Sequence, residues 1–379
     1  MILSDAQLQI QDAARRFAQR EIVPNAAEWD CTCTVPAHLL REMGKLGLMG
    51  MCIDPAWGGA GADWVSYVVA VEEIAAGDCG LCNMMCVNNS PNCAAIEEYG
   101  TPEQKERFLR PLASGEQSSV FLLTEPDAGS DAAAIRTRAT QQGDRFVLNG
   151  TKQFITAGRT AQVALIVAVT DPSAGKRGIS CFLTPTDAPG YRVLREEAKL
   201  GHRAADTCLI ALDDLVIPAS GLLGPLGGGY RIALAYLKNG RIGVPAQAVG
   251  VARAAYQAAL RYAGERKTFG KPIIEHQAIS FKLADMATAI ESARQLTLHA
   301  AQLKDAGRPC LKEASMAKLA ATEMVDRVCF DAIQIHGGNG YLNDFPVEKL
   351  YRDARVLSIY EGSNEIQRLI IGRAIAAER

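Results

Sequence analysis

The chain has 379 residues, 48% of them hydrophobic and 22% charged, so we expect two or three globular domains rather than one core. With 40 basic and 42 acidic side chains, its net charge of −2 gives no basic surface for nucleic acid or an anionic membrane. The longest apolar run, Val163 to Val169, is too short to span a bilayer. Because Met1 leads straight into a helical pattern without an export signal, we expect a soluble, cytoplasmic protein without membrane insertion.

Eleven cysteines, an odd number, are scattered along the chain and indicate reduced thiols rather than a disulfide framework. Cys79 and Cys82 have the C-x-x-C spacing of zinc or iron–sulfur sites, and Cys86 and Cys93 follow them. However, Cys82 and Cys86 lie one helical turn apart among apolar residues, where cysteine behaves as a small hydrophobe. We therefore favour a buried core cluster and predict no metal site.

Residues 1–117 have the pattern of an N-terminal helical domain. A first helix is predicted to begin at Ser4 or Asp5 and to end near Pro24. Thr101 followed by Gln104 is typical of a capping box, in which each residue hydrogen-bonds the backbone of the other. These signals predict several short helices before the first strand.

Residues 118–227 change to the period of two that is typical of strands. The predicted strands are Val120–Leu123, Arg145–Leu148, Val163–Val169, Ile179–Leu183 and Cys208–Val216. Asn149-Gly150 predicts a hairpin turn. Because no helices separate these strands, we expect an antiparallel β-barrel or sandwich rather than a Rossmann unit.

Residues 228–379 return to helical patterns of unusual length. The predicted helices are Tyr230–Gly264, Glu275–Asp305, Leu311–Ile335 and Ser363–Ala377. Helices this long commonly pack as an antiparallel bundle, so we expect a C-terminal four-helix bundle. The predicted fold is thus mainly α with a central β-domain.

Glu361 lies between an apolar run and the last predicted helix, beside Tyr360 and Gly362. Partial burial by these neighbours would raise the pKa of its carboxyl group toward neutral pH, which suits a general base. Gly362 would let the backbone approach a ligand, and Ser363 or Asn364 can cap the following helix. The plainer alternative is a solvated glutamate before a helix.

Two turns in the β-domain could bind an anion or the polar edge of a planar ring. A buried strand leads to Thr124, and the turn after it exposes backbone N–H groups and the Ser130 hydroxyl group. The second turn offers the ring of Phe154 and the hydroxyl group of Thr156. Generic turn chemistry explains each one almost as well.

Together, four separated motifs resemble those of the acyl-CoA dehydrogenase family of flavoproteins. They are Thr124–Asp131, Glu265–Lys271 with His276-Gln277, Gln334–Tyr341 and Ile359–Gln367, in the family's order. The resemblance covers nearly the whole chain. It implies FAD bound without a Rossmann fold, a homotetramer built as a dimer of dimers with part of each site supplied by a neighbouring subunit, and an electron-transferring flavoprotein as electron acceptor.

The resemblance also implies roles for individual residues. Those implied to hold FAD are Phe121, Leu123, Thr124, Gly129, Ser130, Phe154, Ile155, Thr156, Arg266, Thr268, Phe269, Gln277, Gln334, Gly337, Gly338, Ser363 and Glu365. Those implied to contact the acyl-CoA substrate are Ser130, Lys238, Asn239, Arg241, Tyr360, Glu361 and Gly362. Phe154 stands where many members have Trp, and Asp127 replaces a more common Gly, which would put a charge near the flavin.

Glu361 matches the family's catalytic base, which removes the α-proton of an acyl-CoA while a hydride leaves the β-carbon for FAD. Some members carry the base directly before an arginine of the preceding long helix, where this chain has Gly240 and Arg241, so Glu361 is the expected base. The run Gly240–Gly243 resembles the short-chain and 2-methyl-branched subgroups. We expect conversion of a short- to medium-chain or 2-methyl-branched acyl-CoA to the trans-2-enoyl-CoA, in fatty-acid β-oxidation or branched-chain amino-acid catabolism. An oxidase using O₂ and a non-catalytic flavin- or CoA-binding protein are the alternatives.

Overall fold

The computed structural model describes residues 2–378. Short helices form its first part: α1 Asp5–Phe17, α2 Ala26–Thr32, α3 Ala37–Lys45, α4 Trp64–Gly77, α5 Cys79–Val87, α6 Ala94–Tyr99, α7 Pro102–Gln104 and α8 Arg110–Ala113. The predicted capping box at Thr101 and Gln104 is confirmed, and a second one joins Ser4 to Gln7 at the start of α1. α4 is buried on nearly all sides because it packs against both α1 and the long helix α9.

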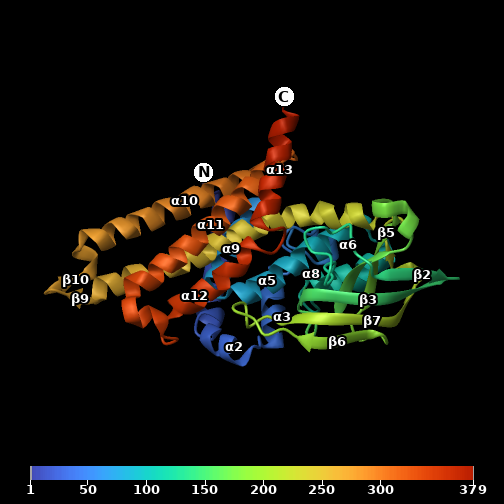
Figure 1. Ribbon diagram of the computed structural model, residues 1–379, viewed down its shortest axis with the longest axis horizontal. Helices are drawn as coiled ribbons and strands as arrows, with labels where there is room; N and C mark the ends of the chain where they lie inside the picture. Colours follow the sequence, from blue (N-terminus) through green and yellow to red (C-terminus); the bar gives the residue numbers. More distant parts are fainter. Residues whose placement is uncertain (1, 379) are drawn as a thin grey trace.

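The middle part is one sheet of eight strands (Figure 1). Its strands are β1 Ser119–Leu122, β2 Arg138–Gln142, β3 Arg145–Thr156, β4 Val163–Val169, β5 Ile179–Pro185, β6 Tyr191–Glu196, β7 Thr207–Pro218 and β8 Leu222–Leu223. The order is β6-β7-β3-β2-β4-β5-β8, with β1 beside β4. Most neighbours are antiparallel as predicted, but β1 and β2 run parallel to β4.

The predicted hairpin turn at Asn149-Gly150 is wrong, because both residues lie inside β3. The turn between β2 and β3 is formed instead by Gly143 and the residue after it. Asn149 exchanges two hydrogen bonds of 2.9 Å with Asp214 on β7. At Gly150 the register shifts, and a β-carbon there would lie 2.5 Å from the Thr137 hydroxyl oxygen, so this glycine permits a bulge with close packing.

The last part contains the predicted long helices α9 Gly229–Glu265, α10 Gln277–Asp305, α11 Leu311–His336 and α13 Asn364–Ala377. A further helix, α12 Pro346–Ala354, was not predicted, and a small hairpin of β9 Lys267–Thr268 and β10 Lys271–Pro272 follows α9. In Figure 1, α9, α10 and α11 lie side by side, and α13 projects from the body. Helix α9 is buried from Arg241 to Ala252 because α4, α10, α11 and α12 surround it. Within residues 2–378, every helix is too short or too polar to span a membrane.

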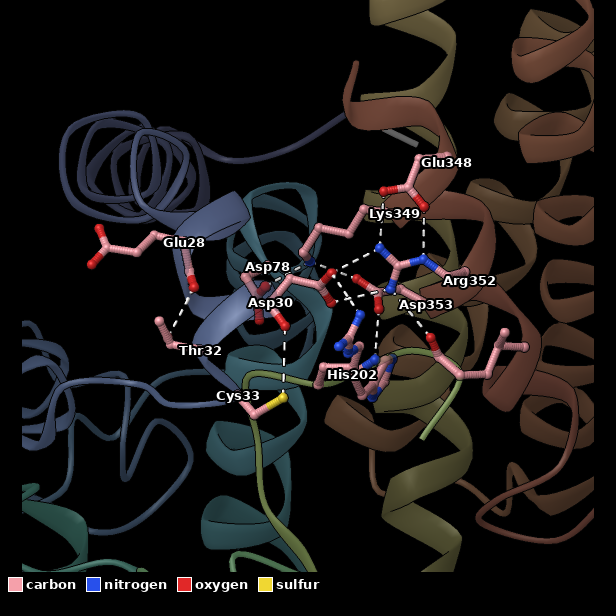
Figure 2. Close-up of polar contacts among 12 residues, drawn as sticks. Glu28, Asp30, Thr32, Cys33, Asp78, His202, Glu348, Lys349, Arg352 and Asp353 are labelled. Atoms are coloured by element: carbon pink, nitrogen blue, oxygen red, sulfur yellow. Dashed lines mark hydrogen bonds and ion pairs between the residues drawn. The ribbon is translucent and has the colours of Figure 1, made fainter. Parts of the chain in front are cut away.

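A network of buried charges joins α12 to the first part of the chain (Figure 2). Lys349 pairs with Asp78 and with Asp353, each at 2.7 Å, and Arg352 pairs with Asp30 at 2.7 Å. Asp353 also accepts a 2.6 Å hydrogen bond from the backbone N–H of His202, in the loop before β7. The network fixes α12, and thereby the segment that leads from α12 to Glu361.

Candidate active site

Glu361 lies in the turn between α12 and α13, with its backbone in the left-handed region at φ 56°. This conformation is uncommon for a residue with a side chain and needs support from its surroundings. On one side, the Tyr360 hydroxyl group donates to Gln247 Oε1 on α9. On the other, Gln367 Nε2 donates to the Gly362 carbonyl oxygen at 2.7 Å. The turn is therefore held from both directions, and the glutamate side chain points into the protein.

The Glu361 side chain is half-buried, and its Oε2 atom is fully buried and has no hydrogen-bond partner among residues 2–378. Burial raises the pKa of Glu361 to about 7, and the positive charges of Arg241 and Lys318 limit that rise. The sequence also predicted that burial raises the pKa of Glu361. A carboxyl group in this state can take up or release a proton near neutral pH.

Gly240 leaves the space that the Glu361 carboxyl group occupies. A β-carbon at Gly240 would lie 2.5 Å from Glu361 Oε2 and 2.9 Å from its carboxyl carbon. Arg241, the next residue, is 8% exposed, and its Nε atom has no partner among the described residues. The sequence excluded another base at Gly240 and placed this glycine in a run typical of a subgroup, but it did not show this close approach to Glu361.

The two predicted turns of the β-domain lie next to each other. The Gln153 N–H donates to the Thr124 carbonyl oxygen at 2.9 Å, and the Thr156 hydroxyl group accepts from Asn83 on α5 at 3.3 Å. Phe154 is 62% exposed at φ 58°, and a β-carbon at Gly129 would meet nothing within 4 Å. An exposed aromatic ring beside hydroxyl groups and open space fits a planar ligand such as the flavin ring.

A buried ion pair between these turns was not predicted. Lys152 is fully buried and its Nζ lies 2.8 Å from Glu125 Oε1 and 2.9 Å from the Leu123 carbonyl oxygen. Glu125 also accepts from the backbone N–H groups of Arg136 and Thr137 at 2.6 and 3.0 Å. Burial lowers the pKa of Lys152 to about 8, and Glu125 opposes that shift. The pair fixes the shape of the turn that follows Thr124.

Several predicted cofactor residues lie far from Phe154 within one chain. Phe269, in the β9–β10 hairpin, is 96% exposed, and Thr268 contacts His276 at 3.0 Å before Gln277 begins α10. The others on this side are Arg266 at the end of α9, Gln334 in the last turn of α11, and Gly337 and Gly338 after it. Figure 1 shows the hairpin at the opposite end of the molecule from β3. One chain thus does not bring the two predicted halves of the FAD site together.

The remaining predicted residues lie as follows. The side chains of Leu123 and Ile155 are buried in the core, so only their backbone groups are available to a ligand. Asp127 is exposed and pairs with Arg136 at 3.5 Å. Asn239 donates to the Ser90 hydroxyl oxygen at 3.1 Å. Phe121 is half-buried, whereas Ser130, Lys238 and Glu365 are exposed.

The expected cap of α13 is wrong in detail. Ser363 occupies the cap position but makes no side-chain capping bond. Asn364 is buried instead, and its Oδ1 atom accepts from Lys318 at 3.0 Å and from Thr322 at 2.9 Å, both on α11. The side chain that could have capped the helix therefore ties the turn to α11.

The cysteine cluster belongs to the core. Cys79, Cys82, Cys86 and Cys93 are all buried free thiols. In residues 2–378 no group of three or more His, Cys, Asp and Glu side chains is placed to hold a metal ion.

Three consecutive family models match the chain: the N-terminal domain of acyl-CoA dehydrogenase over residues 4–116, the middle domain over 120–215 and the C-terminal domain over 227–376. The chain belongs to the acyl-CoA dehydrogenase family. It is an oxidoreductase that acts on acyl-CoA. The family is FAD-dependent, and the related glutaryl-CoA dehydrogenase of Mycobacterium smegmatis has been solved in complex with FADH2.

Individual relatives are similar over almost their full length. The short-chain specific acyl-CoA dehydrogenase of Bos taurus mitochondria is 45% identical over 97% of this chain and 90% of its own. The butyryl-CoA dehydrogenase of Megasphaera elsdenii is 39% identical with a TM-score of 0.97, covering 99% of both chains. A chain from a structural study of the electron transferring flavoprotein of Acidaminococcus fermentans is 41% identical with a TM-score of 0.97, again over 99% of both chains.

Proposed function

We propose that this protein dehydrogenates a short- to medium-chain or 2-methyl-branched acyl-CoA to the trans-2-enoyl-CoA, with Glu361 as the base that removes the α-proton. The observation that carries the proposal is the buried, unpartnered Glu361 Oε2 in the space left by Gly240. Its pKa of about 7 matches the proton transfer it would perform. The names of the Bos taurus and Megasphaera relatives favour the short end of the substrate range.

The α-proton of a thioester is only weakly acidic, so the base must be ionised, correctly placed and shielded from water. The left-handed turn at Glu361, held by Gln247 and Gln367, places the carboxyl group. Arg241 provides a positive charge that favours the ionised form before the proton is taken. Bound FAD supplies the hydride acceptor. Release of the proton from Glu361 to solvent after product leaves restores the base.

FAD would lie with its ring against Phe154, Thr124 and Thr156. Arg266 and Phe269 belong to the end of α9 and the β9–β10 hairpin, which lies far from β3 in the same chain. They would therefore serve the site of a neighbouring subunit, with Arg266 as a charge-assisted donor to the pyrophosphate. This division supports the proposed assembly of dimers into a homotetramer. The similarity to the Acidaminococcus chain supports an electron-transferring flavoprotein as the electron acceptor.

The test is an anaerobic titration of the yellow holoprotein with straight C4 to C12, isobutyryl-, 2-methylbutyryl-, isovaleryl- and glutaryl-CoA, followed by flavin absorbance. Rapid bleaching by a short straight or 2-methyl-branched thioester is the expected result. Binding of every thioester without bleaching would overturn the proposal. Repeating the reaction in air with an oxygen electrode separates a dehydrogenase, which consumes little oxygen, from an oxidase.

A further inference from the structure

Lys318 is a buried cation next to the proposed base. It is fully buried in α11, and its Nζ donates to Asn364 Oδ1 at 3.0 Å. Asn364 is the first residue of α13, three positions after Glu361. A buried ammonium group is costly unless it is paired, and a methionine would fill the same volume at lower cost. The position of this charge therefore suggests a function beyond packing.

The contact with Asn364 ties the turn of Glu361 to α11. Thr322, one helical turn after Lys318, donates to the same Asn364 oxygen at 2.9 Å. Together the two donors fix the first residue of α13, while Gln367 fixes the Gly362 carbonyl oxygen within the turn itself. Lys318 thus helps to hold the turn with the left-handed backbone of Glu361, in addition to the contact between Tyr360 and Gln247.

Lys318 also acts on Glu361 through its charge. The two groups influence each other's ionisation: burial lowers the pKa of Lys318 to about 8, and Glu361 opposes that shift. The charged or titratable groups around Glu361 and Lys318 come from five segments. They are Arg241 on α9, Lys318 on α11, Glu365 on α13, Cys86 on α5 and Tyr360 in the turn.

We propose that Lys318 is a positioning residue for Glu361. It anchors the turn through Asn364, and its positive charge favours the ionised form of the buried Glu361 carboxyl group at neutral pH. The inference rests on the proposed function, because it assigns Lys318 to the proposed base. Arg241 provides a second positive charge, but Lys318 alone combines charge with the anchor at Asn364.

The test compares Lys318→Met with Thr322→Val, which removes a neutral hydrogen bond to the same Asn364 oxygen. The rate of anaerobic flavin reduction by butyryl-CoA, or by the best thioester of the panel, is measured from pH 5.5 to 9.5. In Lys318→Met we expect the rise of this rate with pH to move up by about one pH unit, since loss of an opposite charge disfavours the carboxylate. Thr322→Val should keep the wild-type pH profile. FAD absorbance and melting temperature establish that each variant is folded.

A second readout does not depend on turnover. The pH dependence of the urea midpoint, compared between Glu361 and Glu361→Gln proteins, reports the pKa of Glu361 in the holoprotein. That pKa should be higher in the Lys318→Met background, and Lys318→Gln, which keeps a donor without charge, gives the same comparison if Lys318→Met does not fold. Unchanged pH profiles and unchanged midpoint differences would overturn the inference while leaving Glu361 as the base. Flavin reduction at the wild-type rate in Glu361→Gln would instead overturn the proposed function, which rests on Glu361 as the base.

Discussion

Gly240 and Glu361 share one space: the β-carbon that any other residue would carry at position 240 lies 2.5 Å from Glu361 Oε2. Because real β-carbon contacts are essentially never this close, a β-carbon at position 240 would force the Glu361 carboxyl group, the flexible end of its side chain, to move. A glycine at position 240, directly before Arg241, thus leaves room for the carboxyl group of Glu361.

Gly240→Ala should displace the Glu361 carboxyl group without removing it. A displacement of about 1 Å is expected to lower the rate of flavin reduction roughly 100-fold, because proton transfer depends on alignment. Stopped-flow absorbance measures the rate. The matched control is Gly264→Ala on the same helix, where a β-carbon meets nothing within 4 Å, and this variant should retain the wild-type rate. Equal rates in both variants would contradict the shared space.

Glu361→Gln should change the pH dependence of stability. The native pKa of about 7 lies above the unfolded value of roughly 4.3, so between these values the native chain holds more protons than the unfolded chain. The free energy of unfolding of the wild type therefore falls as pH rises through this window, and the loss is complete above pH 7. Relative to wild type, the glutamine variant should gain about 3 kcal/mol between pH 5 and pH 8.5. Urea unfolding at the two pH values measures this gain, and a constant difference would mean that Glu361 is not buried as described.

Lys152→Met should destabilise the protein and weaken FAD retention. The substitution leaves the Glu125 carboxylate buried without its cation, which typically costs about 3 kcal/mol. Urea unfolding and the fraction of FAD kept after gel filtration are the measurements. Adding Glu125→Gln should recover part of the loss, whereas Lys45→Met, which breaks an exposed pair with Glu42, should change neither quantity. A Lys152→Met protein as stable as wild type would show that the pair does not hold the turn.

The long helices, the strand region and the position of Glu361 at a joint could be predicted from the sequence, because hydrophobic period and cap residues are local signals. The contact between Gly240 and Glu361 could not be predicted, since it joins α9 to a turn far along the chain. Lys318 has the spacing of an ordinary helix lysine, and its burial depends on how α11 packs against α9, α10 and α13. Asn149-Gly150 has strong turn propensity, but pairing with Asp214 on β7 outweighs it.

The spatial arrangement of the residues predicted to bind FAD could not be predicted from the sequence either. Phe154 and Phe269 could be recognised as candidates from their motifs, yet the sequence does not show that the β9–β10 hairpin lies far from β3 in one chain. The Lys152–Glu125 ion pair joins the turn after Thr124 to the turn at Phe154, two motifs that the sequence presents as independent. Such relationships depend on how strands and helices pack and carry no local pattern.

The central claim is tested most directly by mixing wild-type and Glu361→Gln holoproteins with butyryl-CoA, or with the best thioester of the panel, in an anaerobic stopped-flow instrument. If Glu361 removes the α-proton, the wild-type flavin bleaches rapidly. The variant should bind the thioester, seen as a shift of the flavin spectrum, but be reduced at least 100- to 10,000-fold more slowly. Flavin reduction at the wild-type rate in Glu361→Gln would contradict the assignment of the base.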